Sequence, residues 1–135
     1  MTIFLDSSIL CAYANLDDVH HKTSVSLVKD TLSGKYGKCV ITDYIMDETL
    51  TVLQRKSNKK TAIELGKFIL DSEFLIAEID KQTFQKAWEI FQQDNNFSFT
   101  DCTILAFMWT FGINQIATFD KEFSKISNIE VVKNS

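Results

Sequence analysis

The fold of this chain is decided by the stretch Ile3-Phe4-Leu5-Asp6-Ser7-Ser8, close to its start. Three large apolar residues in a row are typical of a strand buried on both faces, as in the middle of a parallel sheet. The run stops at Asp6, so we expect a carboxylate where the strand gives way to a helix, with Ser7 or Ser8 as the cap. Ligands of open parallel sheets bind at that carboxyl edge. Taken alone, Asp6 could equally be only a helix cap, and the rest of the chain has to decide.

The overall composition describes one ordinary domain. A chain of 135 residues can bury roughly two-thirds of the surface that it exposes when unfolded. Its hydrophobic share of 45% and charged share of 24% are usual for a globular protein. Fourteen basic and eighteen acidic residues give a net charge of −4, which argues against a broad basic face for nucleic acid but permits a local basic patch beside a metal. We expect a single domain over residues 1–135.

The cysteines and the apolar segments indicate a cytoplasmic protein. Cys11, Cys39 and Cys102 are odd in number, far apart and without zinc-ligand spacing, as expected of reduced thiols in the cytosol. The N-terminus lacks a basic region followed by a long apolar run, so we expect no signal peptide. The longest apolar region, residues 104–113, is too short and too broken to cross a bilayer. No membrane contact is therefore expected.

Strands and helices are expected to alternate along the chain. The patterns predict strands at residues 3–5, 39–42, 74–79, 115–118 and 129–132, and helices at residues 9–14, 20–33, 43–56, 59–70, after Asp80, and 100–111. This alternation predicts an α/β fold with three layers, α/β/α, around a mostly parallel sheet of four or five strands. Phe84, Ala87, Trp88 and Phe91 have the spacing of a core-facing helical stripe, and the phenylalanines and both tryptophans are expected in the core.

Four acids should meet at one edge of this sheet. A helix that follows a parallel strand begins at the carboxyl edge, and a helix that leads into a strand also begins there because it runs antiparallel to that strand. Asp6 and Asp120 follow strands, whereas Glu48 and Asp101 lie in the first turns of helices. The topology therefore places all four carboxylates at the same edge.

Glu48 is the most informative of the four. At about 100° per residue it lies on the same stripe as Ile45 and Val52, whereas Asp47 points away and is expected to be a solvated surface acid. A carboxylate on the sheet-facing side of a helix is costly unless something pairs with it. Arg55, two turns further on, is one possible partner, and a metal ion is the other.

The acids can be explained by capping or by metal binding. Asp101 can form a capping box with Ser98, and Asp120 can cap the turn that follows it. Four crowded carboxylates, however, repel one another unless a cation is bound. Oxygen ligands without histidine suit Mg²⁺ or Mn²⁺ rather than zinc. Such an ion can polarise a phosphoryl oxygen and activate water against a phosphodiester, and Thr118 could orient a carboxylate or that water.

The residues around these acids resemble the four motifs of PIN-domain nucleases. The matching segments are Ile-Phe-Leu-Asp6-Ser-Ser, Thr42-x5-Glu48, Phe99-Thr-Asp101-Cys-x-Ile-Leu-Ala and Ala-Thr118-Phe-Asp120-Lys-Glu-Phe123. The length and layout are most similar to VapC-type toxins of toxin–antitoxin pairs. The resemblance implies a PIN-like fold, an endoribonuclease that depends on Mg²⁺ or Mn²⁺, frequent homodimers, and a cognate antitoxin that occludes the site. By motif, it implies that Asp6, Glu48, Asp101 and Asp120 form the catalytic, metal-binding site, with Thr118 assisting.

A basic cluster is the predicted contact for RNA. It lies at the corner between two helices and comprises Arg55, Lys56, Lys59 and Lys60. The cluster could hold RNA phosphates or an acidic partner segment, although a simply solvated corner explains it as well. Arg55 is the only arginine in the chain, so the mode of RNA binding stays open.

Other functions fit the same sheet edge. A receiver-type signalling module needs an acid pair after the first strand, but Ser7 and Ser8 follow Asp6. A phosphatase with Asp6 as its nucleophile normally has a second acid two residues later, where Ser8 stands. A non-catalytic binding domain would keep only the fold. His20 and His21 open a helix and are expected to be surface or capping residues.

Overall fold

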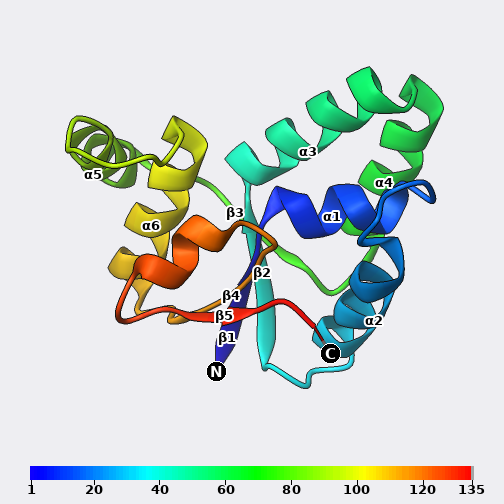
Figure 1. Ribbon diagram of the computed structural model, residues 1–135, viewed down its shortest axis with the longest axis horizontal. Coiled ribbons are helices and arrows are strands. Elements are labelled where there is room, and N and C mark those ends of the chain that lie inside the picture. The colour runs from blue at the N-terminus through cyan, green and yellow to red at the C-terminus, as the bar shows by residue number, and fades with distance from the viewer. Residues whose placement is uncertain (135) are drawn as a thin grey trace.

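The computed structural model describes residues 1–134 and contains one five-stranded sheet (Figure 1). The strand order is β3-β2-β1-β4-β5, and every neighbouring pair is parallel. The strands are β1 (Thr2–Leu5), β2 (Lys38–Thr42), β3 (Leu75–Ala77), β4 (Gln115–Ala117) and β5 (Glu130–Val132). The helices are α1 (Ser7–Ala14), α2 (His21–Leu32), α3 (Asp43–Lys56), α4 (Lys59–Asp71), α5 (Lys81–Phe91) and α6 (Phe99–Phe111), with a short 3₁₀ helix η1 (Lys121–Lys125).

The helices cover both faces of the sheet, as predicted. In Figure 1, α1 to α4 lie on one side of the strands, and α5 and α6 lie on the other. The chain steps outward from β1 to β2 and β3, then returns past β1 to β4 and β5. Because crossover connections between parallel strands are right-handed, this reversal sends the later helices to the opposite face. It also creates a switch point between β1 and β4, where ligands of open α/β sheets bind. The predicted three-layer α/β/α class is therefore confirmed.

The opening apolar run forms the centre of the core. Ile3, Phe4 and Leu5 are fully buried, because β1 is the middle strand and both of its faces are covered by helices. Burying side chains of this size stabilises the fold by about 1.5–3 kcal/mol each. Beyond β1, the helix boundaries differ from the predicted ones by at most two residues. The strand predicted at residues 74–79 is shorter, since only Leu75–Ala77 pairs with β2.

The prediction that the aromatic stripe of α5 faces the core is wrong. Ala87 is buried, but Phe84, Trp88 and Phe91 are 42%, 46% and 43% exposed. The reason is that α5 packs mainly against α6, so its apolar face is wider than the surface available to cover it. Trp109 at the end of α6 is also exposed, so neither tryptophan belongs to the core.

No helix in residues 1–134 is long and apolar enough to span a membrane.

Candidate active site

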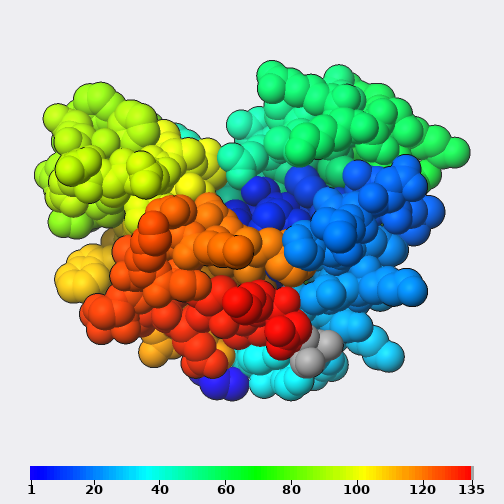
Figure 2. Space-filling model, in the orientation of Figure 1, coloured from blue at the N-terminus to red at the C-terminus, as the bar shows by residue number. Residues whose placement is uncertain are grey.

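The carboxyl ends of the central strands open into a hollow in the molecular surface. Figure 2 shows this hollow between the α5–α6 side and the α3–α4 side of the molecule, with the dark blue start of α1 at its floor. All four predicted acids occupy the elements that surround it. Asp6 and Asp120 follow β1 and β4, and Glu48 and Asp101 lie near the starts of α3 and α6.

Asp6 is the most buried of the four carboxylates. It is 5% exposed and caps α1, with Oδ1 accepting a hydrogen bond from the backbone N–H of Ser7 at 2.8 Å. Its other oxygen, Oδ2, accepts hydrogen bonds from the Thr118 hydroxyl at 2.7 Å and the Ser8 hydroxyl at 3.2 Å. Both oxygens are therefore fixed by the protein, and the capping and site interpretations of Asp6 are compatible.

Glu48 meets the start of α1 rather than an arginine. Its Oε1 accepts a hydrogen bond from the Ser7 hydroxyl. Among residues 1–134, three ion pairs form, and neither Glu48 nor Arg55 belongs to one of them. Asp47 is exposed, as predicted. Of the two partners considered for Glu48, Arg55 is therefore not the one that the structure provides.

Thr118 connects the two strand ends. Its hydroxyl donates to Asp6 and accepts the backbone N–H of Asp120 at 3.0 Å. Asp120 in turn caps η1, since its Oδ1 accepts the backbone N–H of Glu122 at 2.9 Å. The buried threonine therefore orients a carboxylate, which is one of the two roles considered for it.

Asp101 forms the predicted capping box. Its backbone N–H donates to the Ser98 hydroxyl at 3.1 Å, and its Oδ2 accepts the backbone N–H of Ser98 at 3.2 Å. Within residues 1–134, Oδ1 of Asp101 accepts no hydrogen bond from the protein, and the same is true of Oδ2 of Asp120. Each of these two acids therefore caps a helix with one oxygen and leaves the other for a ligand.

The electrostatics show that the carboxylates act on one another. Burial is the main cause that raises the pKa of Asp6, and the negative charge of Glu48 adds to it. Burial likewise raises the pKa of Asp101 to about 6, and the charges of Asp6 and Asp120 push it in the same direction. Such mutual repulsion is what a bound cation would relieve.

The donor set fits a hard divalent cation. In the described part of the chain, no group of three or more His, Cys, Asp or Glu side chains has a geometry that could hold a metal ion as it stands. Mg²⁺, however, usually keeps several waters and takes only one or two carboxylates directly. The free oxygens of Asp101 and Asp120, beside the buried charge of Asp6, match that requirement.

The basic cluster lies at an exposed corner of the molecule, and one of its members also lines a cavity. Arg55, Lys59 and Lys60 are exposed at the corner between α3 and α4. Lys56 is also exposed, but it lines a cavity of about 230 Å³ that includes Ser7. Lys56 therefore shares a cavity with a residue that contacts Glu48.

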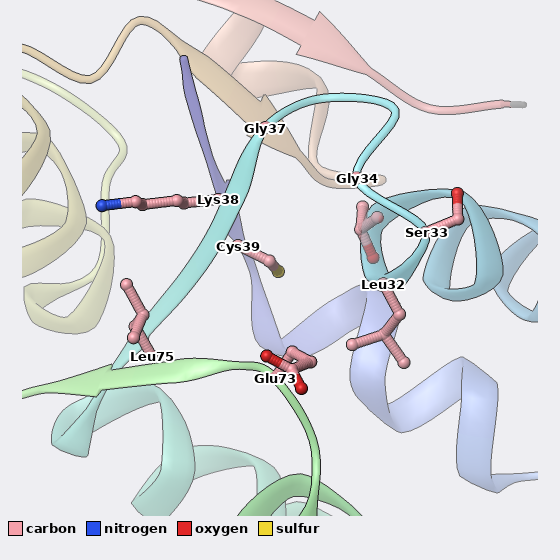
Figure 3. A pocket seen from close by; sticks show the side chains of 9 residues that line it. Leu32, Ser33, Gly34, Gly37, Lys38, Cys39, Glu73 and Leu75 are labelled. Carbon is pink, nitrogen blue, oxygen red and sulfur yellow. The ribbon is translucent and has the colours of Figure 1, made fainter.

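A larger cavity, of about 480 Å³, lies at the opposite edge of the sheet (Figure 3). Lys38 at the start of β2 and Glu73 before β3 are its charged residues, and in Figure 3 the Lys38 side chain points away from Glu73 and Leu32. None of the four acids lines this cavity. Its size alone does not make it the functional site.

Sequence reasoning gave Ser7 and Ser8 no role beyond capping. In the structure, Ser7 binds Glu48, and the Ser8 hydroxyl lies 3.4 Å from that of Thr118 as well as binding Asp6. Their place directly after Asp6, in the first turn of a helix that starts at the sheet edge, was the signal that could have identified them.

We expect Thr118→Val to lower metal-dependent activity by about tenfold, the lower end of the range for residues that orient metal ligands. Valine has nearly the same shape but cannot donate to Oδ2 of Asp6. Since that bond lowers the pKa of Asp6, its loss favours the protonated acid. Metal affinity by calorimetry and cleavage rates check the expectation.

The control is Thr49→Val, because the buried Thr49 hydroxyl has no partner within residues 1–134. Equal losses in both variants would contradict it.

Comparisons with known proteins agree with this geometry. A family model described as PIN domain matches residues 3–129. A VapC ribonuclease of Archaeoglobus fulgidus is 34% identical over 104 residues, which are 75% of this chain and 66%, just under two thirds, of that relative. The 23S rRNA-specific endonuclease VapC20 of Mycobacterium tuberculosis is 27% identical over 131 residues, which cover 96% of this chain and 97% of that relative.

Solved structures share the fold over almost the entire chain. The crystal structure of Mycobacterium tuberculosis VapC20, described as a sarcin–ricin loop cleaving toxin, has a TM-score of 0.82 at 27% identity and covers 96% of this chain and 98% of that one. VapBC2 from Rickettsia felis, bound to promoter DNA, has a TM-score of 0.74 at 14% identity over 100% of both chains, which supports the fold alone. With its parallel sheet, its acids at the switch point and a family match over residues 3–129, this chain belongs to the PIN domain family.

Proposed function

We propose that this protein is a Mg²⁺- or Mn²⁺-dependent endoribonuclease and the toxin of a toxin–antitoxin pair. The observation that carries the proposal is the electrostatic coupling of Asp6, Glu48, Asp101 and Asp120 at the switch point of the sheet. The relatives support RNA as the substrate, because one is named a ribonuclease and the other a 23S rRNA-specific endonuclease.

In this proposal, the four carboxylates hold the metal ion, directly or through water. When bound, a divalent ion supplies Lewis-acid stabilisation of a phosphoryl oxygen and a more acidic water. Thr118 and Ser8 donate to Asp6, which favours the ionised form of that buried carboxylate and fixes its orientation. The Ser7 hydroxyl holds Glu48 against the start of α1.

The basic cluster of Arg55, Lys56, Lys59 and Lys60 provides positive charge for RNA in an otherwise acidic protein. All four side chains are exposed near the α3–α4 corner. Contacts with phosphates make RNA affinity fall with rising salt.

The test is cleavage of a structured RNA by the purified protein with Mg²⁺, with Mn²⁺ and with EDTA. We expect cleavage with one or both ions and none with EDTA. Unchanged cleavage in EDTA, or no cleavage with either ion, would contradict the proposal. Calorimetric titration of each ion measures the metal site independently of turnover.

The proposed partner is a cognate antitoxin, and the proposed location is the cytoplasm. The support is the similarity to VapC20, whose structure is described as that of a toxin. We expect a small open reading frame beside the gene for this chain to encode a protein that binds it and inhibits cleavage. Co-expression and co-purification check this, and an adjacent protein that neither binds nor inhibits would contradict it.

We also propose a homodimer, supported by the exposed aromatic face of α5. Phe84, Trp88 and Phe91 form an apolar surface that a second copy could cover. Trp88→Glu is expected to shift the chain to monomer in light scattering after size exclusion, whereas the exposed neighbour Gln85→Glu should leave the dimer intact. A wild-type chain that is monomeric at high concentration would contradict the dimer.

A further inference from the structure

A second cavity adjoins the acidic site along α1. Its volume is about 230 Å³, below the roughly 300–1,000 Å³ of pockets that enclose a drug-sized ligand, so it suits one small planar group. Ser7 and Ser8 belong both to its lining and to the hydrogen bonds of Asp6 and Glu48. The cavity is therefore continuous with the centre where the chemistry is proposed.

One wall of the cavity is a pair of stacked rings. The rings of His20 and Phe119 lie with their centroids 4.2 Å apart and an angle of 17° between their planes. The His20 side chain is exposed and makes no capping hydrogen bond to α2, although it occupies the capping position. Its backbone is fixed because its N–H donates to Oδ1 of Asp18 at 2.8 Å. The backbone N–H of Phe119 donates to the Ser8 hydroxyl at 3.2 Å, which ties the ring pair to the acidic site.

The lining of the cavity also includes one basic and one acidic residue, Lys56 and Asp18, and Oδ1 of Asp18 is already bound to the His20 N–H. Lys56 is the last residue of α3. Glu48 lies two turns earlier on the same helix, about 12 Å away at 1.5 Å per residue. The two positions are far enough apart along the helix for Lys56 to hold a different phosphate from the one at the acids. Cys11 also lines the cavity, and because burial raises its pKa to about 12, its thiol stays neutral.

We propose that this cavity is a nucleotide subsite, which holds the nucleotide neighbouring the cleaved bond. Its base stacks on the His20–Phe119 pair, and its phosphate binds Lys56. Histidine and phenylalanine are among the side chains on which unpaired RNA bases stack, and the ring pair and Lys56 line the same cavity as the serines that bind Asp6 and Glu48. The inference rests on the proposed ribonuclease function and adds the residues that select and position the substrate.

The ring pair is tested with His20→Ala and the matched variant His20→Phe. Because base–aromatic stacking is sequence-tolerant and strong, His20→Ala is expected to raise KM for a short single-stranded RNA about tenfold, with kcat nearly unchanged. His20→Phe keeps a ring and should restore KM. Since His20 is exposed, neither change removes core packing. Equal KM in wild type and His20→Ala would overturn the subsite.

The phosphate contact is tested by salt dependence. When one lysine–phosphate contact to single-stranded RNA is removed, the slope of log affinity against log salt concentration becomes shallower by about 0.7. We expect this shallower salt slope for Lys56→Gln. We expect no change for Lys29→Gln, because Lys29 is an exposed residue of α2 that does not line the cavity. Fluorescence anisotropy of labelled RNA with the Asp6→Asn protein measures it without turnover. Equal slopes for both lysine variants would overturn the assignment of Lys56.

The two hypotheses fail in different ways. A wild-type protein that binds RNA through His20 and Lys56 but cuts it with neither ion contradicts the nuclease and supports the subsite. A protein that cuts RNA with unchanged KM and salt slope in both variants supports the nuclease and overturns the subsite.

Discussion

Asp6→Asn is expected to lower the rate of RNA cleavage about a thousandfold, which corresponds to roughly 4 kcal/mol of transition-state stabilisation. Asparagine keeps the shape, and its Oδ1 can still accept the Ser7 N–H, but it removes the negative charge at the floor of the hollow and places an N–H₂ group where Oδ2 accepts from Thr118 and Ser8. Because burial already raises the pKa of Asp6, a neutral side chain avoids part of the cost of burial, and the Thr118 and Ser8 hydroxyls can turn to accept from its N–H₂, so the variant is expected to fold. Single-turnover cleavage with Mn²⁺ and calorimetric metal titration measure the two losses.

The matched control is Asp47→Asn, which removes one charge from the same helix as Glu48 but from its exposed face. We expect wild-type rates for this variant. If the two variants lose activity equally, the effect comes from net charge, and if Asp6→Asn cuts at the wild-type rate, the proposed site is wrong.

Asp101→Asn is expected to lower cleavage about a hundredfold and to stabilise the metal-free protein above pH 6. Folding raises the pKa of Asp101 from 3.8 to about 6. The folded state therefore binds an extra proton between these values, and stability is lost as pH rises from about 4 to about 6. Since the side chain is partly exposed, the loss is on the order of 1 kcal/mol. Asparagine has no such loss and can still accept the Ser98 N–H.

Thermal unfolding in EDTA at pH 4.5 and pH 7.5 measures this difference. The variant should exceed wild type by about 4 °C at pH 7.5 and by much less at pH 4.5. Added Mg²⁺ should stabilise wild type more than Asp101→Asn, because the ion binds the native acidic site. If the difference in melting temperature between the variant and the wild type were the same at both pH values, Asp101 would not be the source of the charge repulsion.

The fold could be predicted because the apolar runs have few alternatives. Ile3, Phe4 and Leu5 fit only a strand covered on both faces, and β1 is that strand. Gly112 ends α6 in a left-handed backbone conformation, as expected of a glycine that directly follows the last apolar residue of a helix. The exposed face of α5 could not be predicted, since periodicity shows which residues share a side of a helix but not what covers that side.

The site was predictable to the level of its charges but not of its hydrogen bonds. The direction of parallel strands is enough to bring Asp6, Glu48, Asp101 and Asp120 to one edge. The contact of Ser7 with Glu48, and the ring pair of His20 and Phe119, join residues about forty and a hundred positions apart. Such contacts depend on the angle between helices and on loop geometry, which a single sequence does not specify.

The central place of β1 has a consequence for protein synthesis. Asp6 is synthesised more than a hundred residues before its partner Thr118, which follows the neighbouring strand β4. A nascent chain that stops before β4 therefore lacks both Thr118 and Asp120, so the acids proposed to bind metal cannot come together during the earlier part of synthesis.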